Sequence, residues 1–313
     1  MAFAKKVLRV TFTLVNGTFA GTGQNTLTVS GLRTQVTVKN AGMFAGCHLD
    51  LVVYGLTFSQ MNDISILGIQ LQTQAVLRNQ VTVEASSDGG ASFYTVFIGA
   101  IQTAYADLAG MPDAIFRLTA NSIAAINVLP AQPGGINQGA VSVATLLSSL
   151  AQQAGLQFEN NANINVTLRY PYLWGSVYDQ IKELCAAAGI NWSVVNNTLA
   201  IWPKNGSRSG NGATVPIVSA ATGLVAFPSY TPNGILLKTL YNPAILFGGS
   251  IEVQSKLLTA AAGTALAAAV ALPINGVYAV NELDHELESW VPNGKWFSDI
   301  QAINPAFFVV PTG

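Results

Sequence analysis

The stretch GVYAVNELDHELESW, residues 276–290, alternates as a β-strand does. Successive side chains of a strand point to opposite faces, so a strict alternation divides the stretch into two sets. One face carries Val277, Ala279, Asn281, Leu283, His285 and Leu287, and the other carries Tyr278, Val280, Glu282, Asp284, Glu286 and Glu288. All four acids share one face, although the whole chain has only 15 Asp and Glu residues.

Three interpretations of this acidic face differ in what the charge does. It could be a solvated strand face, where like charges repel one another and do not stabilise the fold. It could hold Ca²⁺ or Mg²⁺, which take oxygen ligands, but four acids along one straight strand extend too far to surround one ion. It could line a channel that conducts DNA, because an acidic wall repels phosphates. The last interpretation requires a ring of subunits.

The composition favours an oligomer. Charged residues make up 9% of the 313 residues, and half of the residues are hydrophobic; roughly 25% charged residues are usual in a soluble domain. A monomer needs surface charge to stay soluble, so we expect other subunits to cover much of the surface. The net charge of −1 and the lack of a basic stripe argue against a nucleic-acid-binding protein.

Despite its apolar composition, the chain is not expected to span a membrane. The best candidate, residues 257–273, is shorter than the roughly 20 apolar residues of a helical span and is mostly alanine, so we predict a short packed helix. Residues 1–17 lack the long apolar core of a signal peptide and predict a strand. Cys47 and Cys185 are too few and too far apart for a disulfide framework or zinc site, and we expect small buried apolar residues.

Turn signals indicate a mainly β chain. Asn-Gly occurs six times and Asp88-Gly89 adds a further pair, and such pairs suit the tight turns of β-hairpins. Up to about residue 125 the sequence predicts one strand after another. VLRVTFTLV (7–15) is the first of them, and FYTVFIGAIQTAYADL (93–108) is among the last.

Two helices interrupt this pattern. VSVATLLSSLAQQAGLQF (141–158) has apolar residues at helical spacing, and Gly155 stands where a helix would end. WGSVYDQIKELCAAAGI (174–190) predicts a second helix, with Ser176 as its cap and Gly189 at its end. A hairpin about Asn196-Asn197 follows. We expect a compact α/β module, a Gly/Ser/Asn-rich linker at 204–213, and then a return to β-structure.

Catalytic motifs are scarce. There is no G-x-S-x-G elbow and no Walker loop, and the glycine-rich residues 17–23 precede no predicted helix that could bind phosphate. His48 and His285 have no companion motif for a Ser-His-Asp set, and a lone Cys47-His48 pair is not a metal signature. We therefore expect no catalytic residues, no metal and no cofactor.

A glycoside hydrolase stays open as an alternative because it needs two carboxyls about 5 to 10 Å apart. The acids near Asp284 could meet that spacing, and Trp290 and Trp296 are close in sequence. Many surface strands could meet it equally well, and no clear aromatic platform for a sugar accompanies the acids.

Several stretches resemble the baseplate hub proteins of contractile-tailed bacteriophages. FYTVFIGAIQTA (93–104) is similar to an early hairpin strand of that family, and residues 141–158 and 174–203 resemble the helix, helix and hairpin of its inserted α/β domain. GGSIEVQS (248–255), NGVYAVNELDHELES (275–289) and GKWFSDIQAI (294–303) resemble the closing strands of its second barrel. His285 and Trp296 match residues common in those strands.

The resemblance implies a mainly β fold, α+β overall, with two tail-tube-like β-barrels and an inserted small α/β domain. The first barrel would occupy residues 1–125, the inserted domain 126–205, and the linker and second barrel 206–313. Three chains would form a homotrimeric ring of six barrels, which suits a three-fold spike on one side and a six-fold tube on the other. Glu282, Asp284, Glu286 and Glu288 would then face the channel.

The function implied is structural and not enzymatic. Such a hub joins the tail tube to the central spike, nucleates tube assembly, contacts other baseplate proteins and lets DNA pass without specific binding. Its place is the virion, in the tail baseplate, after assembly in the host cytoplasm. Two alternatives remain: a tail-tube or tube-initiator protein, and a carbohydrate-binding or carbohydrate-cleaving tail protein with exposed aromatic platforms.

Overall fold

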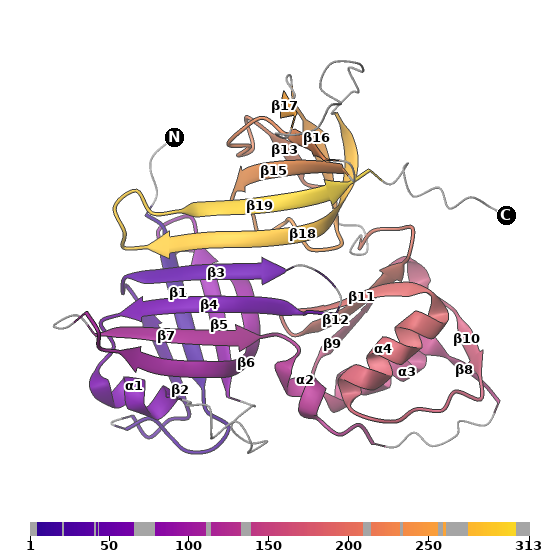
Figure 1. The fold of residues 1–313 in the computed structure, drawn as a ribbon, viewed down its shortest axis with the longest axis horizontal. Coiled ribbons are helices and arrows are strands. Elements are labelled where there is room, and N and C mark those ends of the chain that lie inside the picture. The colour runs from indigo at the N-terminus through magenta and orange to yellow at the C-terminus, as the bar shows by residue number, and fades with distance from the viewer. Residues whose placement is uncertain are drawn as a thin grey trace.

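The computed structural model divides the strands and helices into three groups along the chain (Figure 1). It describes residues 5–20, 22–40, 42, 44–65, 79–110, 114–132, 139–208, 214–231, 234–255, 259–260 and 275–304. The first group contains β1 (Val7–Thr13), β2 (Thr26–Ser30), β3 (Thr34–Asn40), β4 (Cys47–Tyr54), α1 (Phe58–Ile64), β5 (Gln80–Ser86), β6 (Tyr94–Asp107) and β7 (Ile115–Asn121).

The second group carries most of the helix, and the third returns to strands. The second contains α2 (Ala124–Val128), β8 (Ala140–Ser142), α3 (Val143–Gln153), β9 (Gln157–Asn160), a 3₁₀ turn (Asn161–Asn163), β10 (Thr167–Arg169), α4 (Val177–Ala188), β11 (Ile190–Val195) and β12 (Thr198–Pro203). The third contains β13 (Ile217–Ser219), β14 (Ser229–Thr231), β15 (Gly234–Leu240), β16 (Ser250–Gln254), β17 (Thr259–Ala260), β18 (Gly276–Ser289) and β19 (Trp296–Ile303). The prediction of a mainly β chain is confirmed.

One sheet of 14 strands runs through the first and third groups. Strand β18 joins them, because it pairs antiparallel with β19 on one side and with β3 on the other. The sheet path ends at β17 and at β2, and these two ends do not pair with each other among the described residues. The described strands therefore do not close into a barrel.

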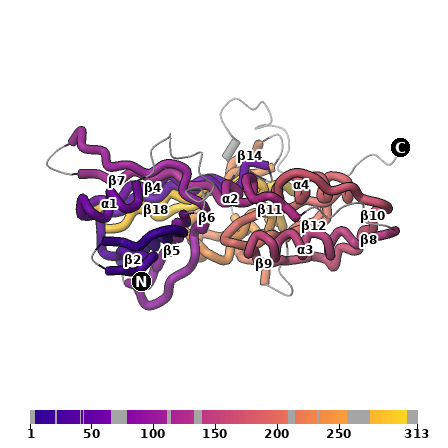
Figure 2. Tube along the Cα trace, turned by 90° about the horizontal axis from the view of Figure 1, so that it is seen from below, coloured from indigo at the N-terminus to yellow at the C-terminus, as the bar shows by residue number. Residues whose placement is uncertain are grey.

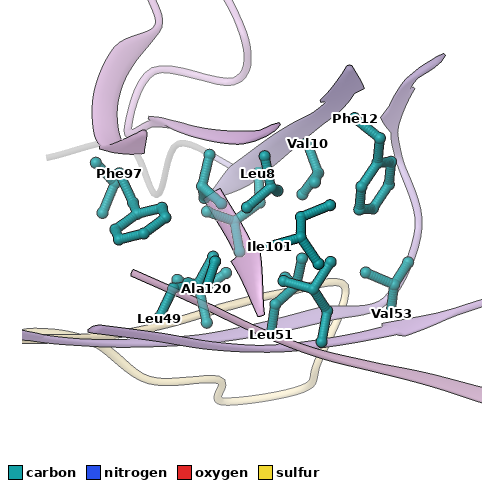
Figure 3. Packing of buried hydrophobic residues seen from close by; sticks show 14 of the residues in the cluster. Leu8, Val10, Phe12, Leu49, Leu51, Val53, Phe97, Ile101 and Ala120 are labelled. Carbon is teal, nitrogen blue, oxygen red and sulfur yellow. The ribbon is translucent and has the colours of Figure 1, made fainter. Parts of the chain in front are cut away.

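The core of the first group lies between two crossing layers of this sheet. Buried and half-buried residues alternate along β1 and β4, as expected for strands with one face in a core. Figure 3 shows Leu8, Val10 and Phe12 of β1 packed toward Leu49 and its neighbours on the facing strands. The rings of Phe12 and Phe116 meet edge to face at 6.2 Å. Because this packing buries one face of β3, β4 and β7, the other face of these strands points away from the core.

The strict alternation predicted for residues 276–290 is wrong at one point. The register between β18 and β19 shifts between Val280 and Glu282, so Asn281 is an extra residue in a β-bulge. One added residue reverses the facing of every residue before it. Tyr278 and Val280 are therefore buried on the same side as Leu283, while Val277 is exposed. The four acids still share one face.

The local signals of the second group are confirmed. Helix α4 begins at a capping box: Ser176 Oγ accepts from the backbone N of Asp179 at 3.2 Å, and the Asp179 carboxylate accepts from the Ser176 backbone N at 3.0 Å. Gly189 (φ 64°) and Gly155 (φ 68°) end α4 and α3 in the left-handed conformation. The second group lies beside the first along the longest axis of the chain (Figures 1 and 2).

Replacing Ser176 by alanine is expected to lower the free energy of unfolding by about 1 kcal/mol, because the backbone N–H of Asp179 loses its acceptor and the Asp179 carboxylate loses the hydroxyl that donates to it. Urea unfolding followed by circular dichroism would measure the change. Substituting the exposed Lys182 in the same helix by alanine serves as the control, since it leaves the cap intact. A loss no larger than that of the control would contradict the prediction.

Two other predictions concern the cysteines and residues 257–273. Cys47 and Cys185 are both buried, as expected. The helix expected at 257–273 lies outside the described residues except for Thr259–Ala260, which form β17. Within the described ranges, no helix is long and apolar enough to cross a membrane.

Candidate functional site

The four acids of β18 lie on the face of the sheet opposite the core, here called the outer face. It runs across β15, β19, β18, β3 and β4, and the strand registers define its rows. One row reads Lys238, Asp299, Asp284, Lys39 and His48 from β15 to β4. The outer face is therefore a mixed polar surface that spans both β groups.

Lysines on neighbouring strands compensate part of the acidic charge. Lys238 Nζ donates to both carboxylate oxygens of Asp299 at 2.9 Å, and Lys39 stands directly across from Asp284. Lys295, in the turn before β19, places its Nζ 3.1 Å from Glu286 Oε2. The sequence gives no sign of these partners, because Lys39 and Lys238 are distant along the chain and only the strand register brings them together.

An acidic excess remains after this compensation. Six carboxylates, those of Glu282, Asp284, Glu286, Glu288, Asp299 and Asp50, face four cations: Lys39, Lys238, Lys295 and Arg33, whose guanidinium lies 4.4 Å from the centre of the Tyr54 ring on β4. This leaves a charge of −2 with histidine neutral. The excess lies along β18, near the middle of the sheet path.

The surroundings of Asp284 disfavour the charged form of its carboxyl group. Partial burial raises its pKa, and the charges of Asp299 and Glu286 raise it further. A hydrogen bond from the backbone N of Asn40, at 3.1 Å, and the charge of Lys39 act in the opposite direction. Asp284 lies directly across from Asp299, and like charges in that position repel. Hydrogen bonds nevertheless hold both acids in place, from the backbone N of Asn40 to Asp284 and from Lys238 to Asp299.

The two histidines lie on opposite faces of the sheet. His48 is half-exposed on the outer face, with Nε2 3.4 Å from Asp50 Oδ1. His285 is buried, its Nδ1 is 2.8 Å from Ser298 Oγ, and the ring of Tyr241 packs on it at 5.3 Å. Burial lowers the pKa of His285 to about 4. Ser298 is itself buried, so this pair does not offer a nucleophile to a substrate.

The two tryptophans near the acids form no open platform there. Trp296 is buried and donates its indole N–H to Ser87 Oγ at 3.0 Å. Trp290 is half-exposed, but Lys5 Nζ stands 3.2 Å from the centre of its ring. Among the residues that the structure describes, no group of three or more His, Cys, Asp or Glu side chains is arranged to hold a metal ion. Burial raises the pKa of Cys47 to about 12, and that of Cys185 also rises.

An aromatic loop that the sequence reading did not single out lies in the second group. Tyr170, Tyr172 and Trp174 follow β10 and are 64%, 67% and 59% exposed. Leu173, between them, is buried and anchors the loop. The run RYPYLWG (169–175), with three aromatic rings in seven residues, was the signal available in the sequence.

The fold is one that tail proteins of prophages share, as the similar structures described below show. The chain belongs to the family described as baseplate hub gp41, whose model matches residues 7–290. The resemblance to phage baseplate hubs is thereby confirmed. Membership implies a structural component of the virion, located in the tail baseplate. No curated protein matches the sequence.

Solved structures share this fold at low sequence identity. The chain is similar to the 43 kDa tail protein of prophage MuSo2 from Shewanella oneidensis, with a TM-score of 0.58, 7% identity, and 96% of this chain and 97% of that chain covered. It is similar to a tail protein from Neisseria meningitidis MC58, with a TM-score of 0.58, 9% identity, and coverage of 96% and 97%.

A third similar structure is the E. coli c3393 protein, with a TM-score of 0.53, 10% identity, and coverage of 87% of this chain and 73% of that chain. That protein is a component of the type VI secretion system and has structural similarity to the T4 phage tail proteins gp27 and gp5. At these identities the likeness concerns the fold alone.

Proposed function

We propose that three copies of this chain form the baseplate hub that joins the tail tube to the central spike. The observation that carries the proposal is the pairing of β18 with β3, which makes one sheet from the two β groups. Three such chains would place six β groups around an axis, and this number suits a six-fold tube and a three-fold spike. In this proposal residues 1–125 and 206–313 are the two tail-tube-like domains, which share one open sheet in the single chain, and 126–205 is the inserted domain.

The outer face would line the channel through which DNA passes. Its acidic excess supports this proposal, because a negative wall repels the phosphates of a passing duplex and avoids holding them. Glu282, Asp284, Glu286 and Glu288 supply most of that excess. The hub would act without catalysis, as a template on which tube subunits begin to assemble and as a contact for the spike and other baseplate proteins.

Electron microscopy of purified tails, and of the protein alone, tests the arrangement. We expect three copies around the tail axis, an open pore, and the strand β18 facing that pore. Six copies per ring would identify a tube initiator instead. A compact particle without a pore, or an outer face turned away from the axis, would contradict the proposal.

Reversing the charge of Glu282 and Glu288 to lysine is expected to slow DNA ejection about tenfold, because charge in a confined passage changes rates by that order or more. The rate can be measured from dye-labelled DNA leaving purified phage in vitro. Glu183→Lys, on the exposed side of α4, is the matched control and should eject DNA at the wild-type rate. An equal rate in all three phages would show that the outer face does not meet DNA.

The aromatic loop favours a second candidate function, binding of carbohydrate at the host surface. Exposed Tyr and Trp rings on an anchored loop offer planar apolar surfaces on which sugar rings can stack. A glycan array probed with the wild type and with the Tyr172→Ala, Trp174→Ala double variant tests it. Retention of a glycan by the wild type and its loss in the variant would support this candidate, and an array without binding would remove it.

A further inference from the structure

A groove of about 410 Å³ opens where the three groups of strands meet. Its aromatic walls come one from each group: Phe44 from the segment between β3 and β4, Trp202 from β12, and Phe247 from the turn before β16. Trp202 and Phe247 are buried, with their rings 6.2 Å apart, while Phe44 is 56% exposed. This junction groove therefore has an apolar floor, formed by the packed rings of Trp202 and Phe247, and one accessible wall, formed by Phe44.

Glycine at position 248 allows that floor to form. Gly248 has a φ of 76°, and a Cβ there would stand 2.6 Å from the Trp202 ring. Any other residue would be strained in this conformation and would displace the indole. The close approach of backbone and ring fixes Trp202 against Phe247, so the floor is preformed and does not need to order on binding.

Asn281 adds an unsatisfied hydrogen-bond acceptor to the groove. It is the extra residue of the β18 bulge, and it lines the groove together with Val280. Its Oδ1 is buried and has no hydrogen-bond partner among the described residues. Bulges re-aim side chains and are frequent beside functional sites. A buried acceptor without a donor destabilises the free protein. Because Asn281 Oδ1 is covered in the free chain, a ligand N–H would recover that loss once the Asn281 amide turns toward the groove.

The charge around the groove is positive. Lys204 lines it, and Lys182 Nζ is 5.7 Å from the centre of the Phe44 ring. No Asp or Glu is among the described residues that line the groove. A negatively charged occupant would therefore be attracted, and this charge complementarity would also favour its approach in the right orientation.

We propose that the junction groove binds a segment of another tail protein that presents a tryptophan next to aspartate or glutamate. Indole combines a large apolar body with a single N–H donor, which matches aromatic walls and one unpaired acceptor. Tryptophan is also a frequent anchor residue at the centre of protein interfaces. Acidic neighbours of the anchor would face Lys204 and Lys182. A protein occupant agrees with the membership of a baseplate hub family, whose members assemble with other chains.

The test uses the full chain and the peptide acetyl-Gly-Asp-Trp-Asp-Gly-amide, titrated by isothermal calorimetry. We expect saturable binding, about tenfold weaker for matched peptides with Phe in place of Trp or with Asn in place of both Asp residues. Asn281→Leu removes the acceptor and keeps the volume. This substitution should weaken binding of the Trp peptide about tenfold and leave binding of the Phe peptide unchanged. General damage to the fold would weaken binding of both peptides.

Two further variants complete the design. Lys204→Glu should weaken binding of the Asp-containing peptide and leave binding of the Asn-containing peptide unchanged. Asp50→Asn, on the outer face, should leave the binding of both peptides unchanged. The proposal is overturned if no peptide binds at millimolar concentration, or if Asn281→Leu affects the Trp and Phe peptides equally. It is also overturned if N-acetyl-tryptophanamide binds as tightly as the peptide, which would indicate a small aromatic ligand. Self-association of the chain that Asn281→Leu abolishes would assign the groove to a second copy instead.

Discussion

Replacing Glu159 by alanine is expected to lower the free energy of unfolding by about 3–5 kcal/mol, because the substitution leaves a buried guanidinium without its partner. The Arg208 side chain is only 7% exposed, and it donates from Nε and from a terminal nitrogen to the two Glu159 oxygens at 3.1 and 2.7 Å. This hydrogen bonding is the main reason that the pKa of Glu159 is lowered. Arginine stays protonated in proteins, so the unpaired positive charge would remain buried.

The ion pair between Glu159 and Arg208 links the second and third groups, so breaking it should affect the structure beyond the two residues. Glu159 lies on β9 of the second group, and the backbone N of Arg208 donates to the carbonyl of Gly248 in the third group. Asn161 also donates to Glu159, at 2.8 Å. The ion pair thus holds the segment that leads from the second group to the third. Its loss should also loosen the contact between Trp202 and Phe247.

Urea unfolding of the wild type and Glu159→Ala measures the effect. The matched control is Glu84→Ala, which breaks a pair of similar geometry, Arg9 with Glu84 at 2.7 and 2.8 Å, whose guanidinium is 36% exposed and stays solvated when the carboxylate is removed. That control should lose less than about 1 kcal/mol. A Glu159→Leu, Arg208→Met double variant should recover most of the loss, because no charge is then left buried. Equal losses in Glu159→Ala and Glu84→Ala would contradict the argument.

Local signals predicted much of this fold. The cap at Ser176, the helix-ending glycines Gly155 and Gly189, and the hairpin turn at Asn196-Asn197, where both residues have positive φ, all appear where the sequence indicates. Each depends on residues close together in the chain. Helix α1 was missed although its signal was present: Thr57 and Gln60 form a capping box. The strand-rich surroundings outweighed that motif.

Non-local features could not be read from the sequence. The alternation of residues 276–290 gave no sign of the bulge at Asn281, because the bulge is defined by the partner strand β19. The lysines beside the acids come from β3 and β15, and their distance from Asp284 depends on strand order and register. The sequence therefore predicted that the four acids share one face of a strand, but it did not indicate the lysines that compensate part of their charge. The junction groove, built from three groups, had no local signature at all.

Acidification from pH 6.5 to pH 4 is expected to lower the free energy of unfolding by about 3 kcal/mol through His285 alone. Burial lowers the pKa of His285 in the folded state to about 4, from an ordinary value of about 6.5. Between these values the unfolded chain binds a proton that the folded chain does not, so stability falls as the pH falls. The effect is absent above about pH 6.5 and complete below about pH 4.

The groups around His285 do not change this sign. Tyr241 and Cys47, which line the same small cavity, both have raised pKa values and stay neutral over this window. Asp284, next in sequence, points to the outer face, and its raised pKa makes the folded state bind a proton more readily, which offsets part of the loss. Carboxylates with lowered pKa, such as Asp179 and Glu159, begin to lose their contribution below about pH 5, as the unfolded carboxyl takes up a proton. The contribution of His285 is therefore separated from theirs between about pH 6.5 and pH 5.

Urea unfolding at a series of pH values between 4 and 7.5 measures the slope. In a His285→Leu, Ser298→Ala double variant, which removes the imidazole together with its hydrogen-bond partner, the slope between about pH 6.5 and pH 5 should largely disappear. A histidine-selective NMR titration gives a second readout, in which the imidazole signals of His285 should not shift until the pH approaches 4. If the double variant loses stability in parallel with the wild type, or if the His285 signals shift near pH 6.5, the imidazole is solvated and the buried environment assigned to it is wrong.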